Sequence, residues 1–164
     1  MSLPQSLLPA LKAAIAAETD PTFVALRNNG AEQPMADWYN AASTFYCWRT
    51  NVSRSEIYNL TSDAGTTWSW TFYKNQSNTE QGAWTQMFMG DQADFSQDNL
   101  RAGIDVIFTS ASSANGTHAK NIGRRVATRA EKVFATGTGT SATPGKFAWQ
   151  GALTAQDISD ALRA

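Results

Sequence analysis

The chain has 164 residues, which is enough for one domain with a hydrophobic core of its own. Charged residues make up 16% of the sequence and the formal net charge is −1, which argues against a strongly basic nucleic-acid-binding domain. The many neutral polar residues instead predict a surface of the kind that packs against copies of the same chain or against other subunits.

The N-terminus and the cysteine content indicate a protein made in a reducing cytosol. Cys47 is the single cysteine, so no intramolecular disulfide can form, and we expect its thiol to lie in the core. The first residues, "MSLPQSLLPALKAAIAAETD", lack the basic region and long apolar stretch of a signal peptide, and no run of about 18 apolar residues could span a membrane. We therefore expect neither classical secretion nor membrane insertion.

The N-terminal part of the chain predicts short helices followed by a strand. Ser6 can cap a first helix, residues 21–28 suit a second, and "MADWYNAAS" suits a third. The aromatic and β-branched residues of 44–50 favour an extended strand. The first helix is indicated by apolar residues at helical spacing: Leu7, Leu8, Leu11 and Ile15.

In the middle of the chain, Ser53 and Glu56 have the spacing of a capping box and predict a short helix. Trp68, Trp70 and Phe72 alternate with period two, which predicts a strand with one buried aromatic face. A short amphipathic helix should follow around Trp84. The next segment, "SQDNLRAGIDVIFTSASS", predicts a helix with an apolar face made of Leu100, Ile104, Ile107 and Phe108.

The segment "THAKNIGRRVATRAEKVFA" predicts one continuous helix, because Ile122, Val126, Ala130 and Val133 repeat at helical spacing. The glycines after it should end it. A weak strand pattern follows, and Thr154 should cap a final helix.

Together these patterns predict a mainly α fold: a bundle of about four to six helices with a minor β-hairpin or short strands and an extended C-terminal arm. We expect residues 1–135 to form the helical core, with a strand-rich insertion around 44–78. Residues 136–164 should form the arm, with a short strand and a terminal helix.

The predicted continuous helix carries a row of basic side chains, since five of the 13 lysines and arginines lie in residues 120–132 and only Glu131 opposes them. The row is either a solvated helix face or a contact surface for an acidic subunit or for DNA phosphates. Its members are Lys120, Arg124, Arg125, Arg129 and Lys132.

The Thr-Gly alternation of residues 136–145 is similar to a phosphate-binding loop, but it follows a predicted helix instead of leading into one, and it has no Gly-Lys-Ser/Thr ending. Nucleotide binding is therefore not expected. With few large side chains, this segment should be mobile alone and should order only against a neighbouring subunit. The residues predicted to make this inter-subunit contact are Thr136, Gly137, Gly139, Phe147 and Trp149.

Catalytic and metal-binding patterns are missing from the sequence. His118 is the single histidine, its neighbours are polar, and no Gly-x-Ser-x-Gly motif accompanies it, so we expect a solvated cap residue. No Cys/His spacing suggests zinc, and the acidic pairs lack a third ligand. We expect no enzyme activity, no cofactor and no metal.

Several segments resemble one family of proteins. "NLRAGIDVIF", "RRVATRAEKVFATGTGTSATPGKFAWQGALTAQDI" and, more weakly, "WYNAASTFYCWRT" are similar to small virion proteins of tailed bacteriophages, the head-tail joining or neck proteins encoded near the capsid genes. The resemblance covers roughly half of the chain, and residues 53–95 lie outside it.

The resemblance implies a non-enzymatic, mostly helical connector or adaptor that joins the portal to the tail in a ring of about a dozen copies. Its partners would be further copies of itself, the portal protein and other neck or tail proteins, with packaged DNA as a further contact and no membrane. It would be made in the bacterial host cytoplasm and end in the virion neck.

Two other functions are compatible with the sequence. A capsid or tail decoration module would use Trp68, Trp70 and Trp84 as exposed rings that stack on carbohydrate. A small cell-wall hydrolase would need His118 and a carboxylate in a cleft.

Overall fold

A computed structural model describes residues 3–164, without the side chain of Ala111. Within this range the chain is mixed, with ten α-helices that cover 54% of it and short strands that cover 12%. The mainly helical character is confirmed, whereas the predicted number of helices is too low. No helix of the described range is long and apolar enough to cross a membrane.

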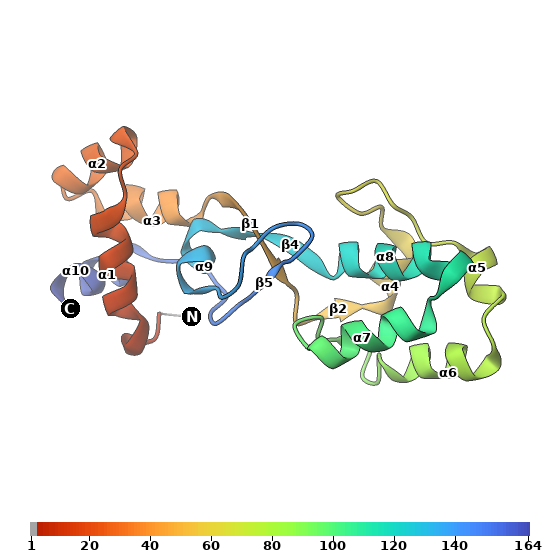
Figure 1. The fold of residues 1–164 in the computed structure, drawn as a ribbon. Coiled ribbons are helices and arrows are strands. Elements are labelled where there is room, and N and C mark those ends of the chain that lie inside the picture. Colours follow the sequence, from red (N-terminus) through yellow and green to blue (C-terminus); the bar gives the residue numbers. More distant parts are fainter. Residues whose placement is uncertain (1–2) are drawn as a thin grey trace. The chain divides into compact units, whose positions relative to one another are not determined.

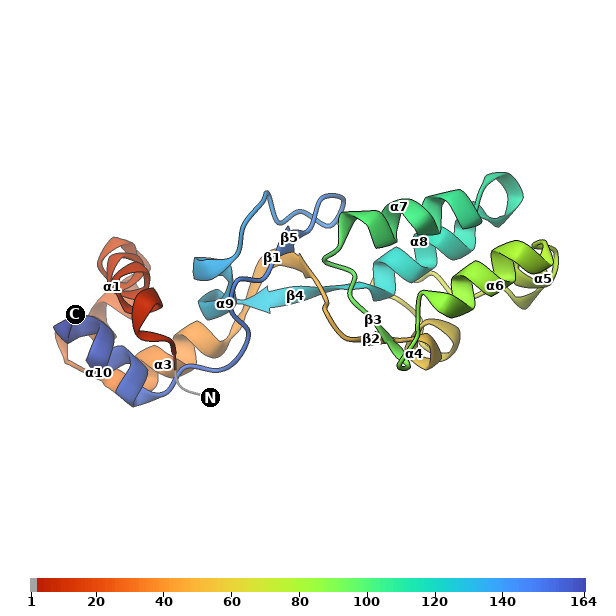
Figure 2. The same ribbon diagram turned by 90° about the horizontal axis from the view of Figure 1, so that it is seen from below.

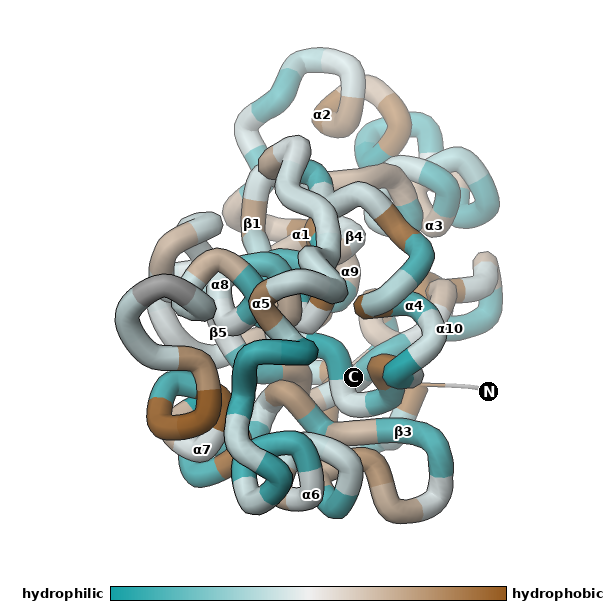
Figure 3. Tube along the Cα trace, turned by 90° about the vertical axis from the view of Figure 1, so that its right-hand side faces the viewer, coloured by the Kyte–Doolittle hydropathy of each residue, from teal (hydrophilic) through white to brown (hydrophobic). Residues whose placement is uncertain are grey.

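The chain divides into two compact units. Unit 1 holds the residues up to Cys47 together with Val126–Ala164, and unit 2 holds Trp48–Arg125. This differs from the predicted division between residues 135 and 136, because the C-terminal residues pack on the N-terminal helices. Figure 3 shows that hydrophobic stretches are short and spread along the chain, so each core is assembled from several elements.

Unit 1 is built on helices from both ends of the chain. In Figure 1, α1 (red) and α10 (blue) lie side by side, and α10 also packs on α3. The unit contains η1 (Gln5–Leu7), α1 (Leu8–Ala17), α2 (Pro21–Asn28), α3 (Glu32–Asn40), α9 (Arg129–Phe134) and α10 (Ala155–Arg163). Its core is Leu3, Leu11, Ile15, Phe23, Met35, Ala36, Tyr39, Ala130, Phe134, Trp149, Leu153, Ile158 and Ala161.

The capping box that starts α10 also ties down the N-terminal segment. As predicted, Thr154 caps the helix, and its N–H and hydroxyl both donate to the Asp157 carboxylate. The second oxygen of this carboxylate accepts from Leu3 N at 2.8 Å. Burial alone would raise the pKa of Asp157, but the hydrogen bonds from Leu3 and Thr154 lower it below its usual value.

A three-stranded sheet has the order β4-β1-β5. Its strands are β1 (Ala42–Trp48), β4 (Arg124–Thr128) and β5 (Gly145–Lys146). The predicted strand over 44–50 is confirmed by β1, on which Cys47 is buried as expected. The C-terminal strand is shorter than its pattern indicated and ends before Phe147 and Trp149.

Unit 2 is helical, with one small β-ladder that pairs Val52 with Ala93 in antiparallel register. In Figure 2, α7 lies beside both α6 and α8. The elements are β2 (Val52–Ser53), α4 (Arg54–Asn59), α5 (Trp70–Lys74), α6 (Asn78–Gln86), β3 (Gln92–Ala93), α7 (Asp98–Ile107), η2 (Ser110–Ser112) and α8 (Ser113–Ile122). The core is Val52, Ile57, Trp68, Trp84, Phe88, Ala93, Phe95, Ile104, Ile107, Phe108, Ala119 and Ile122.

The predicted aromatic strand over Trp68, Trp70 and Phe72 is wrong. Ser69 accepts a hydrogen bond from the backbone N–H of Phe72 and so caps α5, which starts at Trp70. The two tryptophan rings lie 6.2 Å apart, centre to centre, but they differ in exposure. Trp68 lies in the core at 8% exposure, whereas Trp70 is 56% exposed.

Candidate functional site

The basic row does not lie on one helix. The predicted helix through residues 118–135 is wrong, since α8 ends at Ile122, the strand β4 follows, and α9 starts at Arg129. Lys120 therefore lies on α8, Arg124 and Arg125 on β4, and Arg129 and Lys132 on α9.

Two local features explain this break. A Cβ at Gly123 would come within 2.0 Å of the Phe95 ring, so only glycine fits there, and the Gly123 carbonyl accepts from Arg49 N at 2.8 Å instead of from a further turn of helix. Thr128 then caps α9 through a capping box with Glu131. The pattern Thr-x-x-Glu was present in the sequence and is the signal that could have located this helix start.

Part of the row is neutralised by acidic neighbours. The Lys120 ammonium lies 2.5 Å from Asp105, and the Arg124 guanidinium lies 3.2 Å from Asp63. These pairs are structural contacts within unit 2 and leave less charge for a partner.

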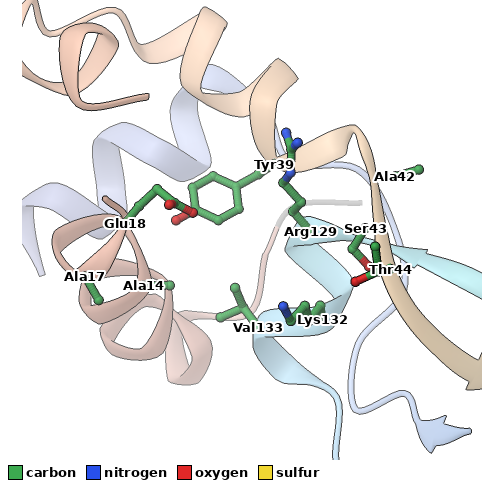
Figure 4. A pocket seen from close by; sticks show the side chains of 10 residues that line it. All are labelled: Ala14, Ala17, Glu18, Tyr39, Ala42, Ser43, Thr44, Arg129, Lys132 and Val133. Atoms are coloured by element: carbon green, nitrogen blue, oxygen red, sulfur yellow. The ribbon is translucent and has the colours of Figure 1, made fainter. Parts of the chain in front are cut away.

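The last two members of the row, Arg129 and Lys132, line a pocket in unit 1 with a volume of about 480 Å³, the α9 pocket. Figure 4 shows both side chains on one side of it and Glu18 on the other, with the Tyr39 ring between Glu18 and Arg129. The lining residues are Ala14, Ala17, Glu18, Tyr39, Ala42, Ser43, Thr44, Arg129, Lys132 and Val133.

The two cations of the α9 pocket are held differently. The Arg129 guanidinium lies 3.9 Å from the centre of the Trp38 ring and donates to the Trp38 carbonyl at 3.0 Å, so its position is fixed. Lys132 is exposed and makes no ion pair or side-chain hydrogen bond with the described residues. Glu18 accepts from Thr19 N and Asp20 N, which partly satisfies its carboxylate.

The Tyr39 hydroxyl is a buried polar group without a partner among the described residues, on a side chain that is 3% exposed. Burial, followed by the nearby Glu18 carboxylate, raises the pKa of Tyr39 to about 12. The hydroxyl therefore stays protonated at neutral pH and keeps a hydrogen to donate. The α9 pocket thus combines a cation held by Trp38, an exposed cation and, in its wall, a buried hydroxyl that has no partner among the described residues.

The predicted inter-subunit arm folds on its own unit. Thr136 and Lys146 form a β-bridge through hydrogen bonds of 3.0 and 2.9 Å, which closes residues 136–146 into a loop. Inside it, the Thr138 hydroxyl donates to the Thr143 carbonyl at 3.0 Å, and the Thr140 hydroxyl accepts from Thr143 N at 2.9 Å. These contacts lie within the chain, whereas the sequence analysis expected the segment to order only against a neighbouring subunit.

The glycines of this loop allow close packing on β1. Gly137 and Gly139 have φ of +95° and +67°, which favours glycine. A Cβ at Gly139 would lie 2.1 Å from the Phe45 ring, and the Gly139 carbonyl accepts from Tyr46 N at 2.7 Å. The Thr-Gly alternation thus forms a loop in which threonine hydroxyls make hydrogen bonds within the loop and Gly139 leaves room for the Phe45 ring.

Trp149 is not available as an anchor for a neighbouring subunit. Its ring is 7% exposed and packs edge-on against Phe134 of the same unit, with 5.6 Å between ring centres. Phe147 is half-buried in its own unit. The structure therefore differs from the predicted inter-subunit anchor, because Phe134 of unit 1 already provides an apolar surface that Trp149 covers.

His118 is a core residue and not the solvated cap that its polar neighbours suggested. It is fully buried on α8, its Nε2 lies 2.7 Å from the Ile57 carbonyl, and its Nδ1 lies 3.0 Å from the Thr66 hydroxyl. Both ring nitrogens are therefore occupied in holding the segment around Thr66 against α8.

The three tryptophans of the carbohydrate alternative do not form one exposed platform. Trp68 and Trp84 are buried and stack on each other with 5.5 Å between ring centres, and only Trp70 faces solvent. Trp70 instead packs on Tyr58 at the edge of a second pocket.

No family model, curated protein or solved structure matches this chain. Function is therefore inferred from the side chains described above.

Proposed function

We propose that the chain is a non-enzymatic structural subunit of a tailed-phage virion that joins the head to the tail, with the α9 pocket as its contact for an acidic group of the portal or of a neighbouring copy. The observation that carries this proposal is that two basic side chains, Arg129 and Lys132, line the same pocket as Tyr39, whose hydroxyl has no partner among the described residues. The resemblance of residues 99–164 to neck proteins is the reason for proposing a place between head and tail.

An Asp or Glu side chain of a partner fits the basic side of the pocket. Arg129 is already oriented by Trp38, so a carboxylate that binds it does not have to order the guanidinium first. Lys132 supplies a second positive charge, and the backbone N–H groups of the incoming segment can donate to Glu18 on the opposite side. Each charge-assisted hydrogen bond of this kind contributes about 1.5–3 kcal/mol.

Repetition around a ring multiplies this small contribution. When many subunits are held together, later contacts form within the assembly, so modest pairwise affinity gives strong attachment. A closed ring of identical subunits therefore does not need a large apolar interface at each contact.

Charge reversal at Lys132 tests the proposal. Lys132→Glu should leave the fold intact because this side chain is exposed and unpaired, but it should repel the acidic partner. The matched control is Lys12→Glu, which makes the same charge change at an exposed position of α1 outside the pocket.

The measurement is complementation of a phage from which the gene is deleted. We expect filled heads without tails from the deletion, restoration by the wild-type chain and by Lys12→Glu, and a loss of at least about tenfold in titre with Lys132→Glu, since tenfold corresponds to about 1.4 kcal/mol. Normal tail attachment with Lys132→Glu would contradict the role of the pocket. Normal tails in the deletion strain would contradict the function itself.

The carbohydrate-binding decoration module stays a second candidate, because Trp70 is exposed beside polar groups. The hydrolase alternative has no such support, since it depended on a histidine that is buried with both nitrogens hydrogen-bonded.

A further inference from the structure

Unit 2 contains a second pocket of about 450 Å³, the Trp70 pocket, between the start of α4, the start of α5 and the turn before β3. Pockets of about 300–1,000 Å³ are typical of sites for small molecules. The lining residues are Ser53, Arg54, Ser55, Tyr58, Asn59, Trp70 and Asp91.

An aromatic wall forms one side of this pocket. The Trp70 ring is 56% exposed and lies 4.7 Å from the Tyr58 ring, centre to centre, at an angle of 55°. The Tyr58 hydroxyl accepts from Nε1 of the fully buried Trp84 at 3.0 Å, so the ring under Trp70 is anchored in the core. The wall is therefore exposed and firmly supported.

The backbone beneath Trp70 is also fixed. The Asn115 side chain is fully buried and forms two 2.9 Å hydrogen bonds with the backbone N–H and carbonyl of Ser69, the residue before Trp70. A platform held in this way loses little entropy when a ligand covers it.

Polar groups of opposite charge line the same pocket. The side chains of Arg54 and Asp91 form no ion pair or hydrogen bond with the described residues. Asn59, which also lines the pocket, donates to the Ser55 hydroxyl at 3.1 Å, and its amide oxygen is an acceptor. The lining therefore offers both donors and acceptors beside the aromatic wall.

We propose that the Trp70 pocket binds a pyranose sugar. A pyranose ring has an apolar C–H face that stacks on an indole and a rim of hydroxyls that both donate and accept hydrogen bonds. Its hydroxyls can therefore serve Asp91 and Arg54 at the same time, whereas a ligand with one net charge would be attracted by one of these groups and repelled by the other. This proposal is independent of the head-tail role, since its residues all lie in unit 2 and outside the α9 pocket.

Titration with simple glycosides tests the proposal on the full chain. The probes are methyl β-D-glucopyranoside, methyl β-D-galactopyranoside and N-acetyl-D-glucosamine, and the readout is the indole N–H signal of Trp70 in proton–nitrogen correlation spectra. The Trp70→Phe spectrum identifies this signal by its absence. We expect at least one probe to shift it with a Kd on the order of 1 mM, the affinity that ligands of this size reach.

Three variants make the result specific, with binding followed by calorimetry. Trp70→Ala should weaken binding of the active probe by at least about tenfold. Asp91→Asn should weaken it by about threefold to tenfold, as expected when a hydrogen bond to a charged group is replaced by one to a neutral amide oxygen. Asn tolerates the left-handed backbone of position 91, where φ is +68°. Val106→Ala is the control, because Val106 is 74% exposed in the same unit but does not line the pocket.

Two outcomes would overturn the proposal. One is the absence of any shift at a probe concentration about 50-fold above the expected Kd, where a site of that affinity would be saturated. The other is unchanged affinity in a folded Trp70→Ala variant. Trp70→Ala removes ring contacts with Tyr58, Trp68 and Tyr73 and should lower the thermal midpoint by a few degrees, so a cooperative thermal transition of the variant is the check that it is folded.

Discussion

Replacing Asn115 by Ala should destabilise unit 2 strongly. The substitution removes two hydrogen bonds of 2.9 Å and leaves the N–H of Ser69 without a partner, whereas the Ser69 carbonyl still accepts from Tyr73 N at 3.1 Å. The orphaned N–H should cost about 1–3 kcal/mol and the lost bond to the carbonyl about 0.5–1.5 kcal/mol, so the two together should cost about 1.5–4.5 kcal/mol. Since small domains have a free energy of unfolding of about 5–15 kcal/mol, this is a large fraction of the total.

Urea unfolding followed by tryptophan fluorescence measures this loss, because Trp68 directly precedes Ser69 and lies in the core. With a slope of about 2 kcal/mol per molar, the midpoint should fall by about 1–2 M. The control is Asn121→Ala, which removes one 3.3 Å contact to the Thr66 hydroxyl and should cost less than about 1 kcal/mol. Equal midpoints for the two variants would refute the anchoring role of Asn115.

Three further outcomes follow from single side chains. Gly139→Ala should lower the thermal midpoint by several degrees, because the new methyl group meets the Phe45 ring and the backbone keeps φ of +67°. Tyr39→Phe should remove a tyrosine titration step near pH 12 from the ultraviolet absorbance and should not lower stability at neutral pH, since the lost hydroxyl has no partner. The pKa of Asp157 is lower in the folded chain than in the unfolded chain, so its carboxylate stabilises the fold at pH values above the usual pKa of about 3.9. This stabilisation is lost as the pH falls through the lower, folded pKa. Asp157→Asn should therefore make the free energy of unfolding depend less on pH in this acid range.

Local chemistry made some of the fold predictable. Thr154 and Asp157 have capping-box spacing, and the structure forms that box. The box of Thr128 and Glu131 begins α9 in the same way, although apolar residues at helical spacing across it favour one continuous helix. Where a cap and a periodic pattern disagree, the cap locates the helix start here, because it satisfies backbone N–H groups directly.

The end of α8, the burial of His118 and the α9 pocket could not be predicted, because they depend on contacts between residues far apart in the sequence. The Phe95 ring occupies the space beside Gly123, the C-cap of α8, but nothing near Gly123 in the sequence indicates that ring. His118 has polar sequence neighbours, yet its partners Ile57 and Thr66 come from another segment. The α9 pocket could not be predicted for the same reason. Helical spacing placed Arg129 and Lys132 in one row with three basic residues that the structure places on α8 and β4.

The exposure of Trp70 has a cost in stability that a ligand could recover. A buried aromatic side chain removes about 150–250 Å² from water, and Trp70 is 56% exposed, so roughly 100 Å² of mostly apolar area stays in solvent. At about 25 cal/mol per Å², full burial would contribute a further 2–3 kcal/mol. The chain instead starts α5 at this residue, caps it with Ser69, and fixes Ser69 through Asn115. A sugar that covers one face of the ring would regain roughly half of this free energy. Its hydrogen bonds to Arg54 and Asp91 would supply the remainder needed for millimolar binding, which corresponds to about 4 kcal/mol.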